Sequence, residues 1–220
     1  MSAETDIEAE KRVAARGAAE LVEDGMTVGL GTGSTVAHLL PALAERGLNL
    51  RCVATSVQTE QHGRELGLHM EPFETLERLD IAIDGADQIA PDRWLIKGGG
   101  GAHTREKIVA AAAARFVVIA DSSKPVERLA PPVPLELSAF GIAATLRRLG
   151  ELGEVRRRDA PPSPDGGVIA DYLGALQDPA ELAARLAAEP GVVDHGLFPG
   201  EMVSDVLVGR GHEVERSTVG

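Results

Sequence analysis

A glycine-rich turn with hydroxyl side chains joins an apolar segment to a helical pattern. The turn, GTGST, spans Gly31 to Thr35, after the apolar run from Met26 to Leu30. Glycines let a backbone approach an anion closely, and hydroxyl and helix N-terminal N–H groups donate to phosphate oxygens. The turn lacks the third glycine of a dinucleotide fingerprint and the Gly-Lys-Ser/Thr end of a nucleotide P-loop. It predicts a monophosphate site; the alternative is a structural turn with an ordinary Ser/Thr cap.

Two carboxylates follow another apolar stretch, Leu79 to Ile83. They are Asp84 and Asp87, separated by Gly85 and Ala86. Open α/β sheets bind ligands at the carboxyl ends of their strands, so both carboxylates are expected to face a polyhydroxylated substrate. The alternatives are a solvated turn and a metal site, but no His or Cys stands nearby to complete a ligand set. We therefore expect no dedicated metal site.

A run of four glycines, Gly98 to Gly101, stands between Lys97 and a helical pattern. Such a run loses much backbone entropy on folding, and it allows the chain to lie against a ligand. Thr104 is the expected N-cap of the helix, which places Glu106 in its first turn. Singly, Lys97 could be a solvated lysine and Glu106 a partner of the helix dipole. Together with the glycines they predict a cation and a base that flank one pocket.

Lysine is rare in this chain, which has four lysines among 22 basic residues. Lys124 follows the predicted strand Phe116 to Ala120, at another strand end. A compact ammonium suits a phosphate or an oxyanion in a way that a planar guanidinium does not. Lys124 is therefore a further candidate anion ligand, whereas Lys107, next to Glu106, is expected at the surface.

The elements that must position these residues alternate between strands and helices. Apolar runs predict strands, helical periodicity predicts helices, and glycine-rich or polar turns separate them. Continuous apolar strands alternating with helices favour a mostly parallel sheet covered on both faces. The expected strands are Met26–Leu30, Arg51–Ala54, Leu79–Ile83, Trp94–Ile96 and Phe116–Ala120, and the expected helices are Ile7–Val22, Val36–Arg46, one ending at Leu66, and Thr104–Arg115.

A proline-rich segment, Leu129 to Pro134, marks a boundary because its prolines cannot continue a helix or a central strand. Beyond it the expected elements follow the order β-α-β-β-α-β of a ferredoxin-like fold. They are Val133–Leu137, Phe140–Leu149, Glu154–Arg158, Val168–Leu173, Pro179–Ala188 and Val192–Phe198.

The C-terminal residues predict a hairpin, Asp205–Val208 with Glu213–Arg216, that returns to the first domain. We therefore expect an α/β domain of residues 1–129 and 202–220, in which a mostly parallel, Rossmann-like sheet is flanked by helices. Residues 130–201 are expected to form a smaller, ferredoxin-like α+β domain.

Composition excludes several classes of protein. A net charge of −12 opposes nonspecific binding to nucleic acid. No apolar run reaches the ~20 residues of a membrane-spanning helix, and the acidic N-terminus does not resemble a secretory signal. The single cysteine, Cys52, excludes an internal disulfide framework and agrees with a reducing compartment. We expect a cytoplasmic protein with no membrane or nucleic-acid partner.

Taken in order, four motifs resemble ribose-5-phosphate isomerase of type A. They are Gly31 to Thr35, Asp84 to Asp87, Lys97 to Gly100 and Thr104 to Lys107, and segments near Lys124, Pro190 and Phe198 extend the similarity over nearly the whole chain. The resemblance implies a cofactor-free, two-domain α/β enzyme, a homodimer or homotetramer, that interconverts ribose 5-phosphate and ribulose 5-phosphate.

The resemblance also implies roles for residues. Glu106 would be the base, with Asp84, Asp87 and Lys97 as its partners in catalysis. Residues that would bind the substrate are Thr32, Gly33, Ser34, Thr35, Gly85, Ala86, Gly98, Gly99, Gly100, Lys124 and Lys11. Gln88, Gly101 and His103 depart from the family pattern. Two alternatives remain, an aminosugar-phosphate deaminase and a sugar-phosphate sensor without catalytic activity.

Overall fold

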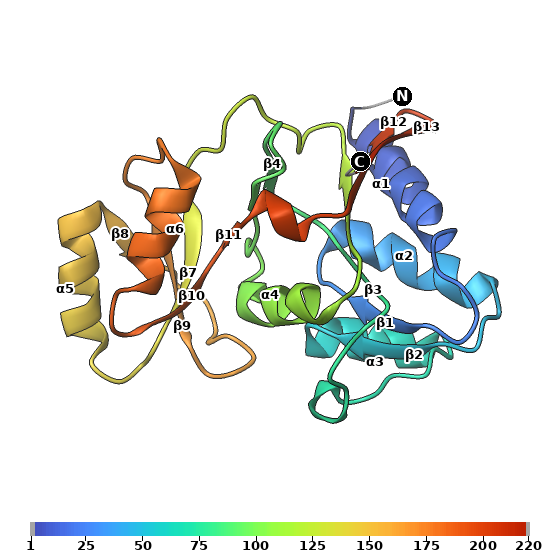
Figure 1. The fold of residues 1–220 in the computed structure, drawn as a ribbon, viewed down its shortest axis with the longest axis horizontal. Helices are drawn as coiled ribbons and strands as arrows, with labels where there is room; N and C mark the ends of the chain where they lie inside the picture. The colour runs from blue at the N-terminus through green and yellow to red at the C-terminus, as the bar shows by residue number, and fades with distance from the viewer. Residues whose placement is uncertain (1–2, 219–220) are drawn as a thin grey trace. The chain divides into compact units, whose positions relative to one another are not determined.

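Two compact units make up the chain in the computed structural model, which describes residues 3–218 (Figure 1). Unit 1 comprises Met1–Ala86, Arg105–Lys124 and Glu201–Gly220, and unit 2 comprises Asp87–Thr104 and Pro125–Gly200. None of the described helices is long and apolar enough to cross a membrane.

A six-stranded sheet forms the centre of unit 1, in the order β13-β12-β6-β3-β1-β2. All neighbouring strands are parallel except the pair β12 and β13. This confirms the mostly parallel sheet and the returning C-terminal hairpin. The strands are β1 (Thr27–Leu30), β2 (Arg51–Ala54), β3 (Ile81–Asp84), β6 (Phe116–Asp121), β12 (Asp205–Arg210) and β13 (Glu213–Thr218).

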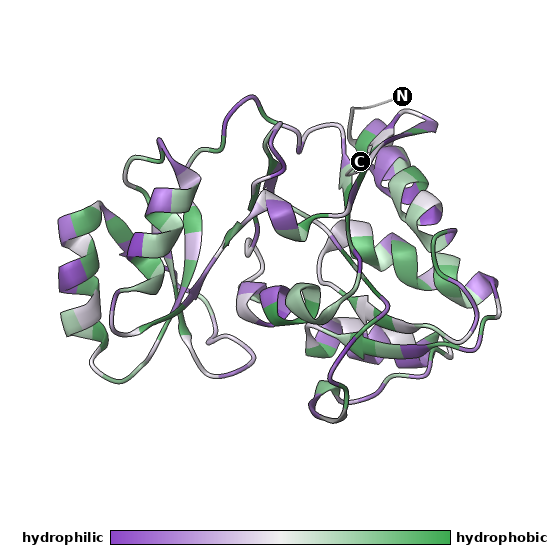
Figure 2. Cartoon of the chain, viewed as in Figure 1, coloured by the Kyte–Doolittle hydropathy of each residue, from purple (hydrophilic) through white to green (hydrophobic). Residues whose placement is uncertain are grey.

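Helices pack on both faces of this sheet, as the continuous apolar strands predicted. Because side chains alternate along a strand, Val28 and Leu30 point into one core with residues of α1 and α2. Gly29 faces the other side, where a Cβ atom would overlap Val109 of α4. Figure 2 shows hydrophobic residues along α2 and these strands. The helices are α1 (Ala3–Ala19), α2 (Ser34–Glu45), α3 (Val57–Glu65) and α4 (His103–Ala112), with a 3₁₀ turn, η1 (Phe73–Thr75).

Unit 2 has a four-stranded antiparallel sheet in the order β10-β7-β9-β8. When the four strands of this sheet are numbered in chain order, they lie in the order 4-1-3-2. The ferredoxin-like prediction is therefore confirmed. The core includes Val133, Leu135, Leu149 and Leu186. The elements are β7 (Val133–Leu137), α5 (Ile142–Leu152), β8 (Val155–Arg157), β9 (Val168–Tyr172), α6 (Pro179–Ala187) and β10 (Val192–His195).

A small third sheet of three antiparallel strands corrects two predictions. Its order is β11-β5-β4, with β4 at Gln88–Ile89, β5 at Leu95–Ile96 and β11 at Leu197–Phe198, followed by the 3₁₀ turn η2 (Gly200–Met202). The expected strand Trp94–Ile96 is thus not part of the parallel sheet. The expected strand Val192–Phe198 is divided at Gly196, after which the chain leaves β7 and pairs with β5.

This small sheet also explains why the two units differ from the expected domains. Residues 87–104 and 125–129 belong to unit 2, although the prediction placed them in the first domain. The second unit ends at Gly200, one residue before the expected position. The proline segment lies near one crossing, but the chain also passes between units after Ala86 and after Thr104.

A buried carboxylate joins three parts of unit 1, and we predict that its loss destabilises the fold. Asp205 is 1% exposed and accepts hydrogen bonds from Arg115 (2.7 Å), Arg216 (3.0 Å) and Thr218 (2.8 Å). Burial by itself raises the pKa of Asp205, but the bonds from Arg115, Thr218 and Arg216 outweigh burial and hold that pKa below its ordinary value. Asp205→Asn should lower the free energy of unfolding at pH 7 by about 1–3 kcal/mol.

The lowered pKa of Asp205 also predicts how the free energy of unfolding changes with pH. A carboxyl with a lowered folded-state pKa contributes stability above its unfolded pKa of about 3.9, and this contribution is lost as the pH falls through the folded value. Urea midpoints of wild type and Asp205→Asn should therefore converge in acid. Glu215→Gln, in an exposed ion pair with Arg210, is the control and should change stability by less than about 0.5 kcal/mol. A difference between wild type and Asp205→Asn that persists unchanged in acid would contradict the assignment.

Candidate functional site

The predicted phosphate turn lies at the start of α2, directly after β1. Gly33 is the N-cap residue, with φ +128°, a backbone conformation that favours glycine. Because glycine has no side chain, the cap residue offers no side-chain acceptor to the first N–H groups of α2. Gly33 and Ser34 are exposed, whereas Thr35 is 8% exposed. This helix end therefore presents N–H and hydroxyl donors that suit an anion.

Asp84 lies at the end of β3 and is bonded directly to this turn. Its Oδ1 accepts from the N–H of Thr32 (3.2 Å) and from that of Gly85 (2.7 Å). The side chain is 3% exposed. A Cβ atom at Gly31 would overlap this carboxylate, so the close approach of the two strand ends requires glycine there. These ends, of β1 and β3, lie where the strand order of the sheet reverses, the usual ligand position in such sheets.

Three threonines fix the remainder of the turn. The hydroxyl of Thr32 lies 2.8 Å from that of Thr55, and the Thr59 hydroxyl donates to the carbonyl of Gly31 (3.0 Å). Ser56 caps α3 by accepting from the N–H of Thr59 (3.2 Å). The polar turn after β2 thus supports the turn after β1.

Lys11 lies on α1 and is connected to α2 through one carboxylate. Its ammonium donates to Glu8 (2.6 Å), and the other oxygen of Glu8 lies 2.9 Å from Nε2 of His38 on α2. Hydrogen bonds from Lys11 and then His38 lower the pKa of Glu8. Glu8 therefore holds a cation next to the helix that begins with the phosphate turn.

The loop that carries Lys124 is bonded to the same N-terminal helix. Glu10 is 8% exposed and accepts from the N–H of Ser122 (2.9 Å) and that of Gly211 (3.0 Å). Burial raises the pKa of Glu10, but the bonds from Ser122 and Gly211 outweigh it and lower that pKa. Asp121 accepts from the N–H of Ser123 (2.9 Å) and shapes the turn that ends at Lys124. The helix that holds Lys11 thus also positions the Lys124 loop.

Glu106 lies in the first turn of α4, as predicted, and is 5% exposed. The start of the helix differs from the prediction: α4 begins at His103, so Thr104 lies inside the first turn and does not cap it. The Thr104 hydroxyl instead donates to Glu136 on β7, a carboxylate that also accepts from Ser163. Glu136 is 2% exposed and anchors the start of this helix.

In unit 2, Lys97 is almost fully buried at the end of β5. It is 3% exposed, and its ammonium lies 5.5 Å from the centroid of the Phe198 ring, a cation–π geometry. Its backbone N–H donates to the carbonyl of Gly196 (2.9 Å). The chain then turns at Gly98, where φ is +103° and a Cβ atom would lie 2.6 Å from Nδ1 of His103. The surface-lysine alternative for Lys97 is therefore wrong.

Asp87 and Gly99 are also brought together in unit 2. The N–H of Gly99 donates to Oδ2 of Asp87 (2.8 Å), and a Cβ atom at Gly99 would lie 2.9 Å from Oδ1. A Cβ atom at Gly100 would meet nothing within 4 Å. Gln88, which departs from the family pattern, exchanges two hydrogen bonds of 2.8 Å with the backbone of Ala130. Its role in the structure is to hold the proline segment.

The predicted site residues therefore form two sets, each within its own unit. Unit 1 holds the phosphate turn, Asp84, Gly85, Ala86, Glu106, Lys11 and Lys124, and unit 2 holds Asp87, Lys97, Gly98, Gly99 and Gly100. Glu8, Glu10 and Glu136, which support these sets, were not predicted. Among the described residues, no group of three or more His, Cys, Asp or Glu side chains is arranged to hold a metal ion.

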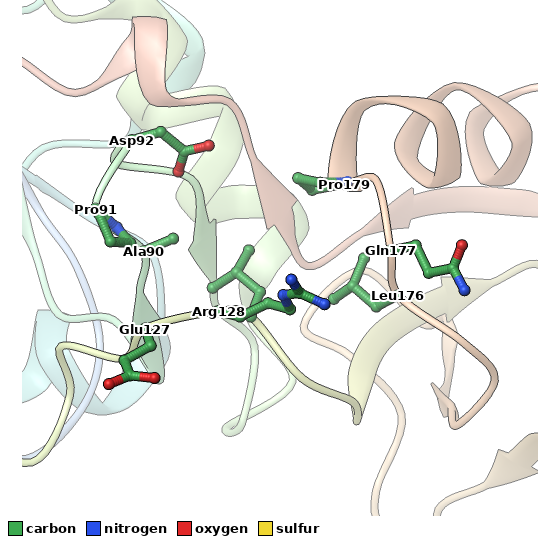
Figure 3. Close-up of a pocket in the computed structure, with 9 residues that line it drawn as sticks. Ala90, Pro91, Asp92, Glu127, Arg128, Leu176, Gln177 and Pro179 are labelled. Atoms are coloured by element: carbon green, nitrogen blue, oxygen red, sulfur yellow. The ribbon is translucent and has the colours of Figure 1, made fainter.

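A cavity of about 340 Å³ in unit 2 contains none of the predicted site residues (Figure 3). It is lined by residues 90–92, 127–129, 176, 177 and 179. In the view of Figure 3, the side chains of Glu127 and Arg128 point in different directions. The cavity thus does not bring together the groups to which the sequence assigned chemistry.

Comparisons with known proteins show the family of this chain. The model of ribose 5-phosphate isomerase A (phosphoriboisomerase A) matches residues 51–213. Ribose-5-phosphate isomerase A of Methylorubrum extorquens is 50% identical over 86% of this chain and 88% of its own, and that of Natronomonas pharaonis is 46% identical over 92% and 93%. A solved D-ribose-5-phosphate isomerase in complex with phospho-erythronic acid is 32% identical, has a TM-score of 0.91 and covers 100% of both chains.

Proposed function

This chain belongs to the ribose 5-phosphate isomerase A family, and from that premise we propose that Glu106 moves a proton between C2 and C1 of an open-chain pentose phosphate. The chain is an isomerase of ribose 5-phosphate. Isomerisation requires opening of the sugar ring, removal of the C2 proton to give an enediolate, transfer of the O2 hydroxyl proton to O1, and delivery of a proton to C1. Ribulose 5-phosphate is then the product.

The observation that carries this proposal is the position of Glu106. It is a 5% exposed carboxylate in the first turn of α4, directly beyond the glycine run. The N-terminal end of a helix favours a negative charge, so the ionised carboxylate is stabilised and can accept a carbon-bound proton. Thr104, bonded to Glu136, fixes the helix end from which Glu106 projects.

The enediolate oxygens need cationic or hydrogen-bonding partners. We assign this role to Lys97 and to backbone N–H groups of the glycine run, because preorganised donors stabilise a developing oxyanion strongly in a water-poor site. Phosphorylated erythronic acid, the ligand of the similar solved structure, has a planar carboxylate that resembles a planar enediolate in shape and charge. The presence of this ligand in a structure that is 32% identical to this chain supports the same assignment.

Asp84 and Asp87 would accept and donate hydroxyl protons of the sugar during ring opening. Each is held in place by a backbone N–H, Asp84 by Thr32 and Gly85, and Asp87 by Gly99. We assign both carboxylates to the sugar hydroxyls.

The phosphate group would bind at the turn before α2, with Thr32, Ser34, Thr35, Lys124 and Lys11. We predict that Lys124→Ala raises the KM for ribose 5-phosphate by about tenfold or more, because a charge-assisted hydrogen bond contributes roughly 1.5–3 kcal/mol. Free ribose should be a poor substrate. Steady-state kinetics and inhibition by inorganic phosphate measure the effect. Unchanged values for both in the variant would remove Lys124 from the phosphate site.

An assay that follows formation of ribulose 5-phosphate from ribose 5-phosphate tests the function itself. Release of ammonia from an aminosugar phosphate, without pentose isomerisation, would instead favour the deaminase alternative. Binding of ribose 5-phosphate without turnover would favour the sensor.

We also propose that the enzyme acts in the cytoplasm as a homodimer or homotetramer. The family resemblance supports the assembly, and the single cysteine, which allows no internal disulfide, agrees with a reducing compartment. Light scattering should give about two or four times the chain mass of 23.0 kDa. A monomer mass at micromolar concentration would contradict the proposed assembly.

A further inference from the structure

Arg158 lies directly after β8 in unit 2 and is bound to the next strand by both backbone and side chain. Its N–H donates to the carbonyl of Ile169 (2.9 Å), which continues the pairing of β8 and β9. Its guanidinium donates to both carboxylate oxygens of Asp171, from Nε (2.8 Å) and from Nη2 (2.6 Å). The side chains of Arg158 and Asp171 are 20% and 19% exposed. This two-bond geometry fixes the plane of the guanidinium.

The third nitrogen of the same group reaches the glycine run. Nη1 of Arg158 donates to the carbonyl of Gly99 (2.8 Å) and to that of Gly98 (3.1 Å). A lysine ammonium could not bind Asp171 through two bonds and reach both carbonyls, because it lacks the planar fork. Arg158 therefore connects Asp171 of β9 to two glycines that lie 60 and 59 positions before Arg158 in the chain.

These bonds, together with the bond from the N–H of Gly101 to the carbonyl of Gly98 (3.0 Å), determine where the amides of the glycine run point. In a planar trans peptide the carbonyl and the following N–H point in opposite directions. With the Gly98 carbonyl on Arg158, the N–H of Gly99 points away from Arg158, and there it meets Asp87 at 2.8 Å. Because the Gly99 carbonyl accepts from Arg158, the N–H of Gly100 also points away from Arg158, and Gly100 is exposed.

Glycine needs such an external restraint more than any other residue, since its backbone has the widest choice of conformations. We propose that Arg158, held by Asp171, is a positioning residue for the isomerisation: it orients the Gly99 amide toward Asp87 and the Gly100 amide toward the substrate oxygen. Arg158 does not touch the sugar. This inference rests on the proposed function of Asp87 and the glycine run.

The first test is kinetic. Arg158→Ala should lower kcat for ribose 5-phosphate by about 10-fold to 100-fold, the order expected when catalytic groups are displaced by about 1 Å. KM should change by less than about threefold, because the residues assigned to the phosphate are elsewhere. Guanidinium at millimolar concentration should restore part of kcat, whereas ethylammonium should not. Arg157→Ala is the matched control, since this neighbouring arginine is exposed, and it should keep wild-type kcat.

The second test does not depend on activity. Amide hydrogen exchange of a peptide covering Lys97 to His103 should be about tenfold faster in Arg158→Ala than in wild type and Arg157→Ala. Arg158→Lys, which keeps charge and chain length, should show the same kinetic loss and faster exchange; it serves if the alanine variant does not fold.

The outcomes separate the two proposals. A wild-type enzyme without isomerase activity would overturn the proposed function, while exchange would still report whether Arg158 holds the glycine run. An active enzyme in which Arg158→Lys keeps wild-type kcat, or in which exchange is unchanged, would overturn the role of Arg158. A rise in KM alone, with kcat unaltered, would overturn it too.

Discussion

Glu106→Gln should lower kcat by about 10²–10⁴, the usual contribution of a positioned general base. Glutamine keeps the shape of the side chain but cannot accept a proton from carbon. The substitution replaces one oxygen by nitrogen, so it leaves the packing of this buried side chain in the first turn of α4 in place. Fixed-time assays of ribulose 5-phosphate formation measure the loss of kcat.

Binding and folding should survive this substitution. The affinity for phospho-erythronic acid, measured by calorimetry, should stay nearly unchanged, as should the circular dichroism spectrum. Glu60→Gln is the matched control, because Glu60 is also a first-turn glutamate, on α3, and is paired with Arg64 at 2.6 Å. It should retain wild-type turnover. If Glu106→Gln keeps more than about a tenth of wild-type kcat, Glu106 is not the base, and Asp84 or Asp87 becomes the candidate.

Gly31→Ala should lower kcat/KM by about 10²-fold or more, although it adds only one methyl group. That methyl would overlap the carboxylate of Asp84, whose Oδ1 holds the N–H groups of Thr32 and Gly85. The predicted phosphate turn and Asp84, which we assign to the sugar hydroxyls, would therefore move together. Overpacking of this kind also destabilises a protein by about 1–3 kcal/mol.

Gly150→Ala is the control for that glycine substitution. Gly150 lies inside α5, and a Cβ atom there meets nothing within 4 Å. Alanine should leave kcat/KM unchanged and stabilise the helix by about 0.5–1 kcal/mol. A folded Gly31→Ala enzyme with kcat/KM within threefold of wild type would contradict the close approach of Gly31 and Asp84.

Much of the fold was predictable because its long elements have clear periodicity. The strands that begin at Thr27 and Phe116 are continuous apolar runs, and the second unit shows the order of helices and strands of a ferredoxin-like fold. The two-residue strands β4, β5 and β11 were not predictable as a sheet, because so short a segment has no period. The pairing of β11 with β5 depends on contacts between residues about 100 positions apart, which also decide the unit to which residues 87–104 belong.

The candidate site was predictable where its residue types are unusual. Glycine runs and carboxylates at strand ends stand out in a sequence, and so does a lysine in a chain rich in arginine. Arg158 does not stand out, since it follows Arg156 and Arg157, and only the pairing of β8 with β9 distinguishes the three. In the sequence, Glu8 and Glu10 fit the solvated face of a helix. Their hydrogen bonds become apparent only in the structure, where α1 packs on α2 and β6. Sequence motifs are better at identifying residues that contact a substrate than at identifying residues that keep other residues in position.

Deuterium incorporation during turnover tests the proton transfer by Glu106 most directly. In D2O, the wild-type enzyme should place solvent deuterium at C1 of ribulose 5-phosphate and at C2 of recovered ribose 5-phosphate, both visible by NMR. In Glu106→Gln, exchange and isomerisation should fall in parallel, because both need the same proton abstraction. Turnover by the wild type without any deuterium, or exchange at the wild-type rate in Glu106→Gln, would contradict the mechanism.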